Sequence, residues 1–72
     1  MQITETFKNR LTEIMDSELP TELKDIRLAV LMTDMESVYQ IPTISKKLRE
    51  GFERKHPDVM ELYREVSFAR SI

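Results

Sequence analysis

The sequence lacks several residue types that small domains use to reinforce themselves. It has no cysteine, no tryptophan, one glycine and one histidine in 72 residues. Without cysteine the chain has no disulfide and no thiolate ligand, and one histidine is too few for a structural zinc site. A single glycine is also too little for a phosphate-binding loop. We therefore expect no metal and no cofactor, and we expect helix packing or self-association to supplement a small core.

Long apolar runs are missing as well. The longest one extends only from Leu28 to Met32, whereas a membrane-spanning helix needs about 20 mostly apolar residues. The opening segment, MQITETFKNR, shows no basic stretch followed by an apolar one, which is the pattern of a secretion signal. These features predict a cytoplasmic protein that makes no contact with a membrane.

The net charge is only −2, but the two halves of the chain differ in sign. Residues 1–40 carry four basic and eight acidic side chains, and residues 41–72 carry seven basic and five acidic ones. The mildly basic half favours an acidic partner, whereas the overall charge is unfavourable for binding DNA unaided.

Helical spacing of apolar residues is present throughout, and no segment alternates between apolar and polar residues as a half-buried strand does. The pattern predicts one all-α domain over residues 1–72, with four helices at about 4–17, 21–40, 43–55 and 57–70. Pro20, Pro42 and Pro57 mark the junctions, because proline interrupts a helix and is favoured at its first position. Thr21 and Thr43 are the expected N-caps of the second and third helices.

The second predicted helix is apolar on two sides, which is typical of a helix that contacts neighbours on both. Leu23, Ile26 and Val30 share one side. The other side and the leftover apolar residues of the fourth helix make our candidate interface for a homodimer, which consists of Leu28, Leu31, Met32, Met35, Tyr39, Met60, Phe68 and Ile72. Methionine also fills irregular gaps in cores, so core packing is the alternative for Met32 and Met35.

The third predicted helix carries most of the positive charge. Its candidate basic surface consists of Lys46, Lys47, Arg49, Arg54 and Lys55. Glu50 and Glu53 stand four residues from basic partners, a spacing that favours ion pairs along an exposed helix face. We therefore predict a solvated, self-paired surface. Ile44, Leu48 and Phe52 are expected to form the buried face of this helix.

Two short segments resemble known families. Thr43-Ile44-Ser45-Lys46-Lys47-Leu48 resembles the start of the recognition helix in helix-turn-helix DNA-binding proteins. That resemblance implies a helix from Thr43 that enters the major groove. The preceding residues, Val38-Tyr39-Gln40-Ile41-Pro42, depart from the small residue and glycine of the family's turn.

The second segment is His56-Pro57-Asp58, which follows a basic amphipathic helix and is similar to the tripeptide of J-domain co-chaperones. That resemblance implies contact with an Hsp70 partner. The alternative is a plain helix junction, in which Pro57 opens the fourth helix and Asp58 decorates its first turn.

Catalysis has little support in the residues. Histidine is the commonest general base, and the only one is His56, with Ser67 and Ser71 as the nearest downstream serines. We expect a non-enzymatic protein-interaction or regulatory module that associates with itself and with an unidentified protein. The alternatives are a helix-turn-helix-like nucleic-acid-binding protein and, less favoured, a J-domain-like co-chaperone.

Overall fold

The computed structural model describes residues 3–70 and confirms the predicted all-α class. It contains α1 (Ile3–Asp16), α2 (Thr21–Tyr39), α3 (Lys46–Lys55) and α4 (Pro57–Ala69), and this part of the chain has no strand. Three of the predicted helices agree with the structure to within one residue at each end. The third begins three residues later than predicted.

The late start of α3 has a local cause. Ser45 is its N-cap, and the Ser45 hydroxyl accepts a hydrogen bond from the Leu48 backbone N–H. Thr43 therefore lies outside the helix rather than capping it. Thr21 is likewise not a cap, because it is the first helical residue of α2 and Pro20 occupies the N-cap position without a side-chain hydrogen bond. Both predicted N-caps are therefore wrong.

Gln40 ends α2 in the left-handed conformation, with φ 59° and ψ 45°. The backbone N–H groups of Gln40 and Ile41 both donate to the Glu36 carbonyl oxygen, which stabilises the last turn. Ile41 is buried directly after this turn. The chain thus leaves α2 with an apolar anchor, and Pro42 follows outside the helix.

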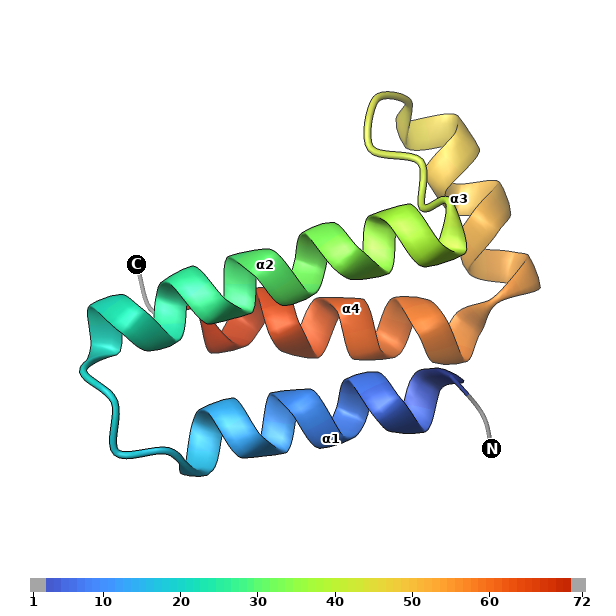
Figure 1. Ribbon diagram of the computed structural model, residues 1–72. Helices are drawn as coiled ribbons and strands as arrows, with labels where there is room; N and C mark the ends of the chain where they lie inside the picture. Colours follow the sequence, from blue (N-terminus) through green and yellow to red (C-terminus); the bar gives the residue numbers. More distant parts are fainter. Residues whose placement is uncertain (1–2, 71–72) are drawn as a thin grey trace.

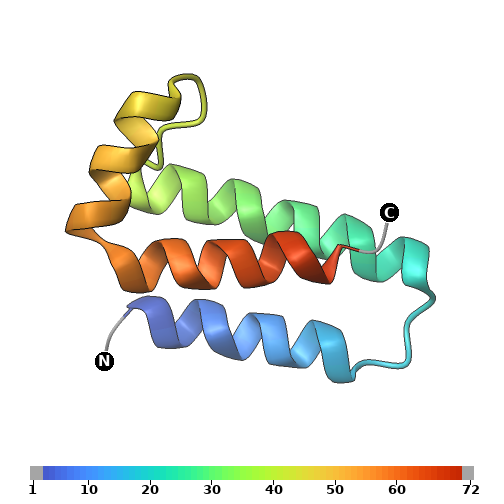
Figure 2. The same ribbon diagram turned by 180° about the vertical axis from the view of Figure 1, so that it is seen from behind.

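Helices α1, α2 and α4 lie side by side as a three-helix bundle (Figures 1 and 2). Helix α2 runs antiparallel to the other two and contacts both of them. The buried side chains between the three helices form a single core, which consists of Phe7, Ile14, Leu28, Leu31, Met35, Ile41, Val59, Met60, Leu62, Tyr63 and Val66. Met60, which was predicted to lie in the dimer interface, belongs to this core, whereas Met15 of α1 is exposed.

Helix α3 stands apart from the bundle. It projects at the end where α2 finishes and α4 begins, and α4 is the only helix that it contacts (Figure 1). None of its residues is buried. The predicted buried face is therefore wrong for Ile44 and Leu48, which are 100% and 64% exposed, and only Phe52 packs partly against the core.

The two tyrosines of the core region differ in their polar contacts. The Tyr63 hydroxyl donates a hydrogen bond to the Glu36 carboxylate, and burial together with this bond raises the Tyr63 pKa to about 12. The Tyr39 ring stacks at a tilt on Phe7, with ring centroids 5.6 Å apart. The Tyr39 hydroxyl is buried without a hydrogen-bond partner among residues 3–70, and burial raises its pKa as well.

Candidate interaction surfaces

Most of the candidate interface from the sequence lies inside the chain. Leu28, Leu31, Met35 and Met60 are core residues, and Met32 and Tyr39 pack against that core. A second chain does not reach these side chains while the fold holds. The core-packing alternative for the methionines therefore describes Met32 and Met35. Phe68 is 90% exposed, and Ile72 lies outside the described residues.

The exposed apolar side of α2 is the opposite one. Leu23, Ile26 and Val30 are exposed by 46%, 59% and 51% of their surface. Their spacing of three and then four residues continues at Thr33 and Ser37, which are also exposed. We call these five residues, Leu23, Ile26, Val30, Thr33 and Ser37, the outer seam of α2. A repeat of three and four residues keeps side chains on one line along a helix and is the pattern through which helices pair.

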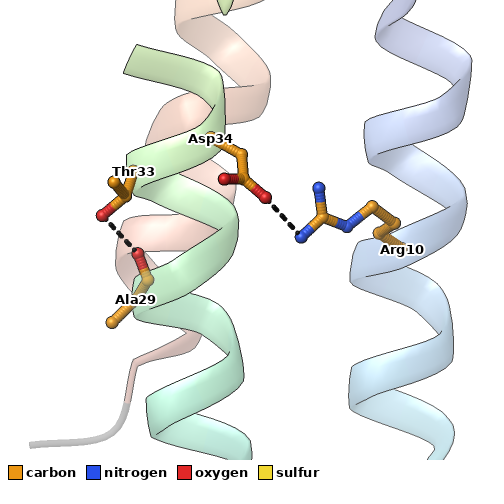
Figure 3. Close-up of polar contacts among 4 residues, drawn as sticks. All are labelled: Arg10, Ala29, Thr33 and Asp34. Carbon is orange, nitrogen blue, oxygen red and sulfur yellow. Dashed lines mark hydrogen bonds and ion pairs between the residues drawn. The ribbon is translucent and has the colours of Figure 1, made fainter. Parts of the chain in front are cut away.

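The borders of the outer seam are polar. Arg10 of α1 forms an ion pair with Asp34 of α2, with 2.9 Å between Nη2 and Oδ2 (Figure 3). Asp34 points toward α1 in this view, whereas Thr33 lies on the side of α2 away from α1. The Thr33 hydroxyl donates to the Ala29 carbonyl oxygen at 3.0 Å, so its hydrogen-bonding need is met within α2. The seam thus combines apolar side chains with a threonine that needs no further partner.

An open hollow of about 260 Å³ lies between α1 and the outer seam. It is lined by Arg10, Glu13, Ile14, Arg27 and Val30. Val30 belongs to both the hollow and the seam, so the two form one continuous surface. Arg27 is exposed there and has no ion-pair partner within the described part of the chain. A second helix laid on the seam would find a charged group at its edge.

The basic surface of α3 differs from its prediction in one respect. No ion pair joins residues four apart within α3, as far as residues 3–70 show. Glu53 instead pairs with Arg64 of α4, and Arg49 donates from Nε to the Pro42 carbonyl oxygen at 3.2 Å. These two contacts fix α3 to its surroundings. Lys46, Lys47, Arg54 and Lys55 remain exposed.

His56, Pro57 and Asp58 form the junction between α3 and α4. His56 ends α3, Pro57 is the first residue of α4, and Asp58 lies in its first turn. The His56 ring lies 4.8 Å from the Phe52 ring, centroid to centroid. All three residues are exposed, and the backbone geometry is that of the helix junction named as the alternative to the co-chaperone motif.

The helix-turn-helix resemblance does not extend to the start of α3. Thr43 and Ile44 precede α3 instead of opening it, and Ile44 is fully exposed. A recognition helix in this place would begin at Lys46.

Two other features are absent from the part of the chain that the structure describes. Within residues 3–70 no group of three acidic or histidine side chains is placed to hold a metal ion. None of the helices described here has both the length and the apolar character needed to cross a membrane. No protein-family model, curated protein or solved structure matches this chain.

The outer seam is the feature that sequence reasoning undervalued. Leu23, Ile26 and Val30 share one side of the second helix, but the predicted interface lies on the other side, which has more apolar residues. The regular spacing of three and four residues from Leu23 to Ser37 was a signal available in the sequence. The larger apolar group was the better candidate for the core, because a small domain has few apolar residues to spare.

Proposed function

We propose that this chain is a small, non-enzymatic interaction module that forms a homodimer through the outer seam of α2. The single observation that carries the proposal is the line of exposed apolar side chains, Leu23, Ile26 and Val30, on a helix whose other side already fills the core. Single exposed apolar residues are ordinary on protein surfaces, whereas several in one line mark an interaction site.

A second copy is the occupant that the seam itself favours. Most soluble homo-oligomers are two-fold symmetric dimers, in which one patch packs on its own copy. The seam suits such packing because its Thr33 hydroxyl is satisfied and its apolar residues share one line. Arg27 and Asp34, which border the seam, have opposite charges seven residues apart. In an antiparallel pair of α2 helices, Arg27 of each copy would approach Asp34 of the other.

Sedimentation of the purified protein across micromolar concentrations tests the proposal. We expect a species of twice the 8.5 kDa chain mass. Ile26→Glu should yield a folded monomer, because it places an unpaired charge in the seam without entering the core. Phe68→Glu is the matched control, because it also removes an exposed apolar residue but lies outside the seam, and it should leave the dimer intact.

Two results would overturn this proposal. A wild-type protein that remains monomeric at the highest concentrations would remove self-association altogether. A dimer that survives Ile26→Glu but is lost in Phe68→Glu would move the interface from α2 to α4.

A further inference from the structure

Helix α3 carries an excess of positive charge on a part of the chain that contributes little to the core. Residues 46–55 hold five basic and two acidic side chains, whereas the rest of the chain holds six basic and eleven acidic ones. Lys46, Lys47, Arg54 and Lys55 are exposed, and none of them is in an ion pair with another of the described residues. The net charge of −2 therefore conceals one cationic helix on an otherwise acidic molecule.

This cationic helix is placed where a large partner can reach it. Helix α3 crosses the end of the bundle and extends past α2, on the side of α2 that lies away from α1 (Figures 1 and 2). Its C-terminal end joins α4, so its N-terminal end, with Lys46 and Lys47, lies farthest from the core.

The outer seam of α2 faces a different direction from the one in which α3 projects. Figure 3 shows α2 with α1 beside it and α4 behind it, and in this view Asp34 points toward α1 while Thr33 lies on the opposite side. By helical spacing Val30 lies between these two positions. The seam thus faces away from α4, out of the plane across which α1, α2 and α3 are spread (Figure 1).

Pairing of two seams would therefore give both α3 helices one orientation. In the antiparallel pair that brings Arg27 to Asp34, the two-fold axis is perpendicular to α2 and to the line between the two copies. That axis runs along the direction in which α3 projects, so the two α3 helices project to the same side, one at each end of the dimer. From Val30, the middle of the seam, to Tyr39 is nine residues, so the two ends of α2 lie about 27 Å apart at 1.5 Å per residue.

We propose that the two α3 helices of this dimer bind double-stranded DNA along one face, one helix at each of two major grooves. Successive turns of B-form DNA repeat at about 34 Å, and α3 lies at and beyond the end of α2 (Figure 1), so the spacing of the two helices suits one turn. Lys46 and Lys47 would contact phosphates, so binding depends little on base sequence. An anionic membrane or an acidic protein also attracts cations, but neither requires two helices at this spacing. The proposal rests on the dimer through the outer seam.

Fluorescence anisotropy with labelled random-sequence duplexes tests the proposal on the full chain. One duplex has about 24 base pairs and holds both α3 helices, whereas the other has about 10 base pairs and holds only one. We expect the longer duplex to bind at least about tenfold more tightly. Two lysines from each copy would neutralise four phosphates, so the logarithm of the binding constant should fall with the logarithm of salt concentration at a slope of about −4.

Three variants locate the binding. Lys47→Gln removes one cation from each α3, so it should make the salt slope shallower by about two and weaken binding by about tenfold or more. Lys8→Gln is the matched control on an exposed position of α1, away from the projecting end of α3, and should change little. Ile26→Glu should bind the longer duplex no more tightly than the shorter one, because a monomer has a single α3.

Sedimentation without DNA reports the dimer independently, so the two proposals fail separately. A dimer that does not bind the longer duplex at low salt would overturn DNA binding and leave the dimer standing. Equal affinity of wild-type protein for the two duplexes, or undiminished binding by Ile26→Glu, would remove the paired arrangement of α3. Binding unchanged in Lys47→Gln would place the DNA elsewhere on the chain. Binding of anionic vesicles or polyglutamate, but not of DNA, would assign α3 to a membrane or to an acidic protein.

Discussion

Helices α3 and α4 follow one another directly, yet they use their apolar residues in opposite ways. Helix α4 buries Val59, Met60, Leu62, Tyr63 and Val66 between α1 and α2, while α3 buries none of its residues. Both have apolar residues at helical spacing. The difference lies in position, because α4 returns along the bundle and α3 projects from its end (Figure 2). Periodicity therefore identifies which residues share a face, and only the tertiary arrangement decides whether that face is covered.

The largest expected effect compares the same substitution on the two helices. Leu62 is 1% exposed and Leu48 is 64% exposed. Leu62→Ala should lower the free energy of unfolding by about 2–5 kcal/mol, because it leaves a cavity in the core. Leu48→Ala should lower it by less than about 1 kcal/mol, as surface changes do. Urea unfolding of both variants measures the difference, and similar losses would mean that α3 is covered in solution.

The next effect concerns the hydroxyl groups of the two tyrosines. Tyr63→Phe should lower the free energy of unfolding by about 1–3 kcal/mol, because Glu36 loses its hydrogen-bond donor. Tyr39→Phe removes a buried hydroxyl that has no hydrogen-bond partner in the described part of the chain, so it should be neutral or slightly stabilising. Urea unfolding distinguishes these outcomes. An equal loss in both variants would show that the Tyr39 hydroxyl has a partner after all.

The hydrogen bond from Tyr63 to Glu36 makes the free energy of unfolding depend on pH in the alkaline range. Burial and the bond to Glu36 raise the Tyr63 pKa from 10.0 to about 12, so the folded state favours the neutral phenol. This contribution is fully present below pH 10 and is lost as the pH rises toward 12. Tyr63→Phe should make stability fall less steeply across that window, measured by urea unfolding at a series of pH values. If the free energy of unfolding fell equally steeply with pH in Tyr63→Phe, Tyr63 would not be the source of this pH dependence.

The smallest expected effect tests whether one side of α3 is uncovered in solution. Gly51→Ala should raise the free energy of unfolding by about 1 kcal/mol, because alanine favours the helix and its methyl group meets nothing. Thermal unfolding followed by circular dichroism measures the gain. A loss of stability would indicate a neighbour at Gly51 in solution, and with it a covered α3.

Much of the fold was predictable from local chemistry. The three prolines placed the junctions, and the helical spacing of apolar residues predicted the four helices. The start of α3 was less predictable, because Thr43 and Ser45 are both capping residues and local sequence does not rank them. Met60 was placed off the core because its position on the helix wheel lies at the margin of the inner face, where contact depends on the neighbouring helices.

The interaction surfaces were harder to predict for a related reason. On α2, Leu31 and Val30 are adjacent apolar residues, and spacing alone does not say which one faces the core. The structure buries Leu31 and exposes Val30. On α3, the charges at four-residue spacing predicted ion pairs within the helix, but Glu53 forms its ion pair with Arg64 of α4. Both differences come from contacts between helices, which the spacing of residues within one helix does not reveal.

The most direct measurement of the central claim, that the outer seam of α2 faces a second copy, is chemical cross-linking of single-cysteine variants. The chain has no cysteine of its own, so a short bifunctional maleimide reacts only at the introduced site. Val30→Cys should give a cross-linked dimer at micromolar concentrations, and the added change Ile26→Glu should abolish it. Glu61→Cys, on an exposed position of α4, should give none. Cross-linking no greater at Val30→Cys than at Glu61→Cys would contradict the account.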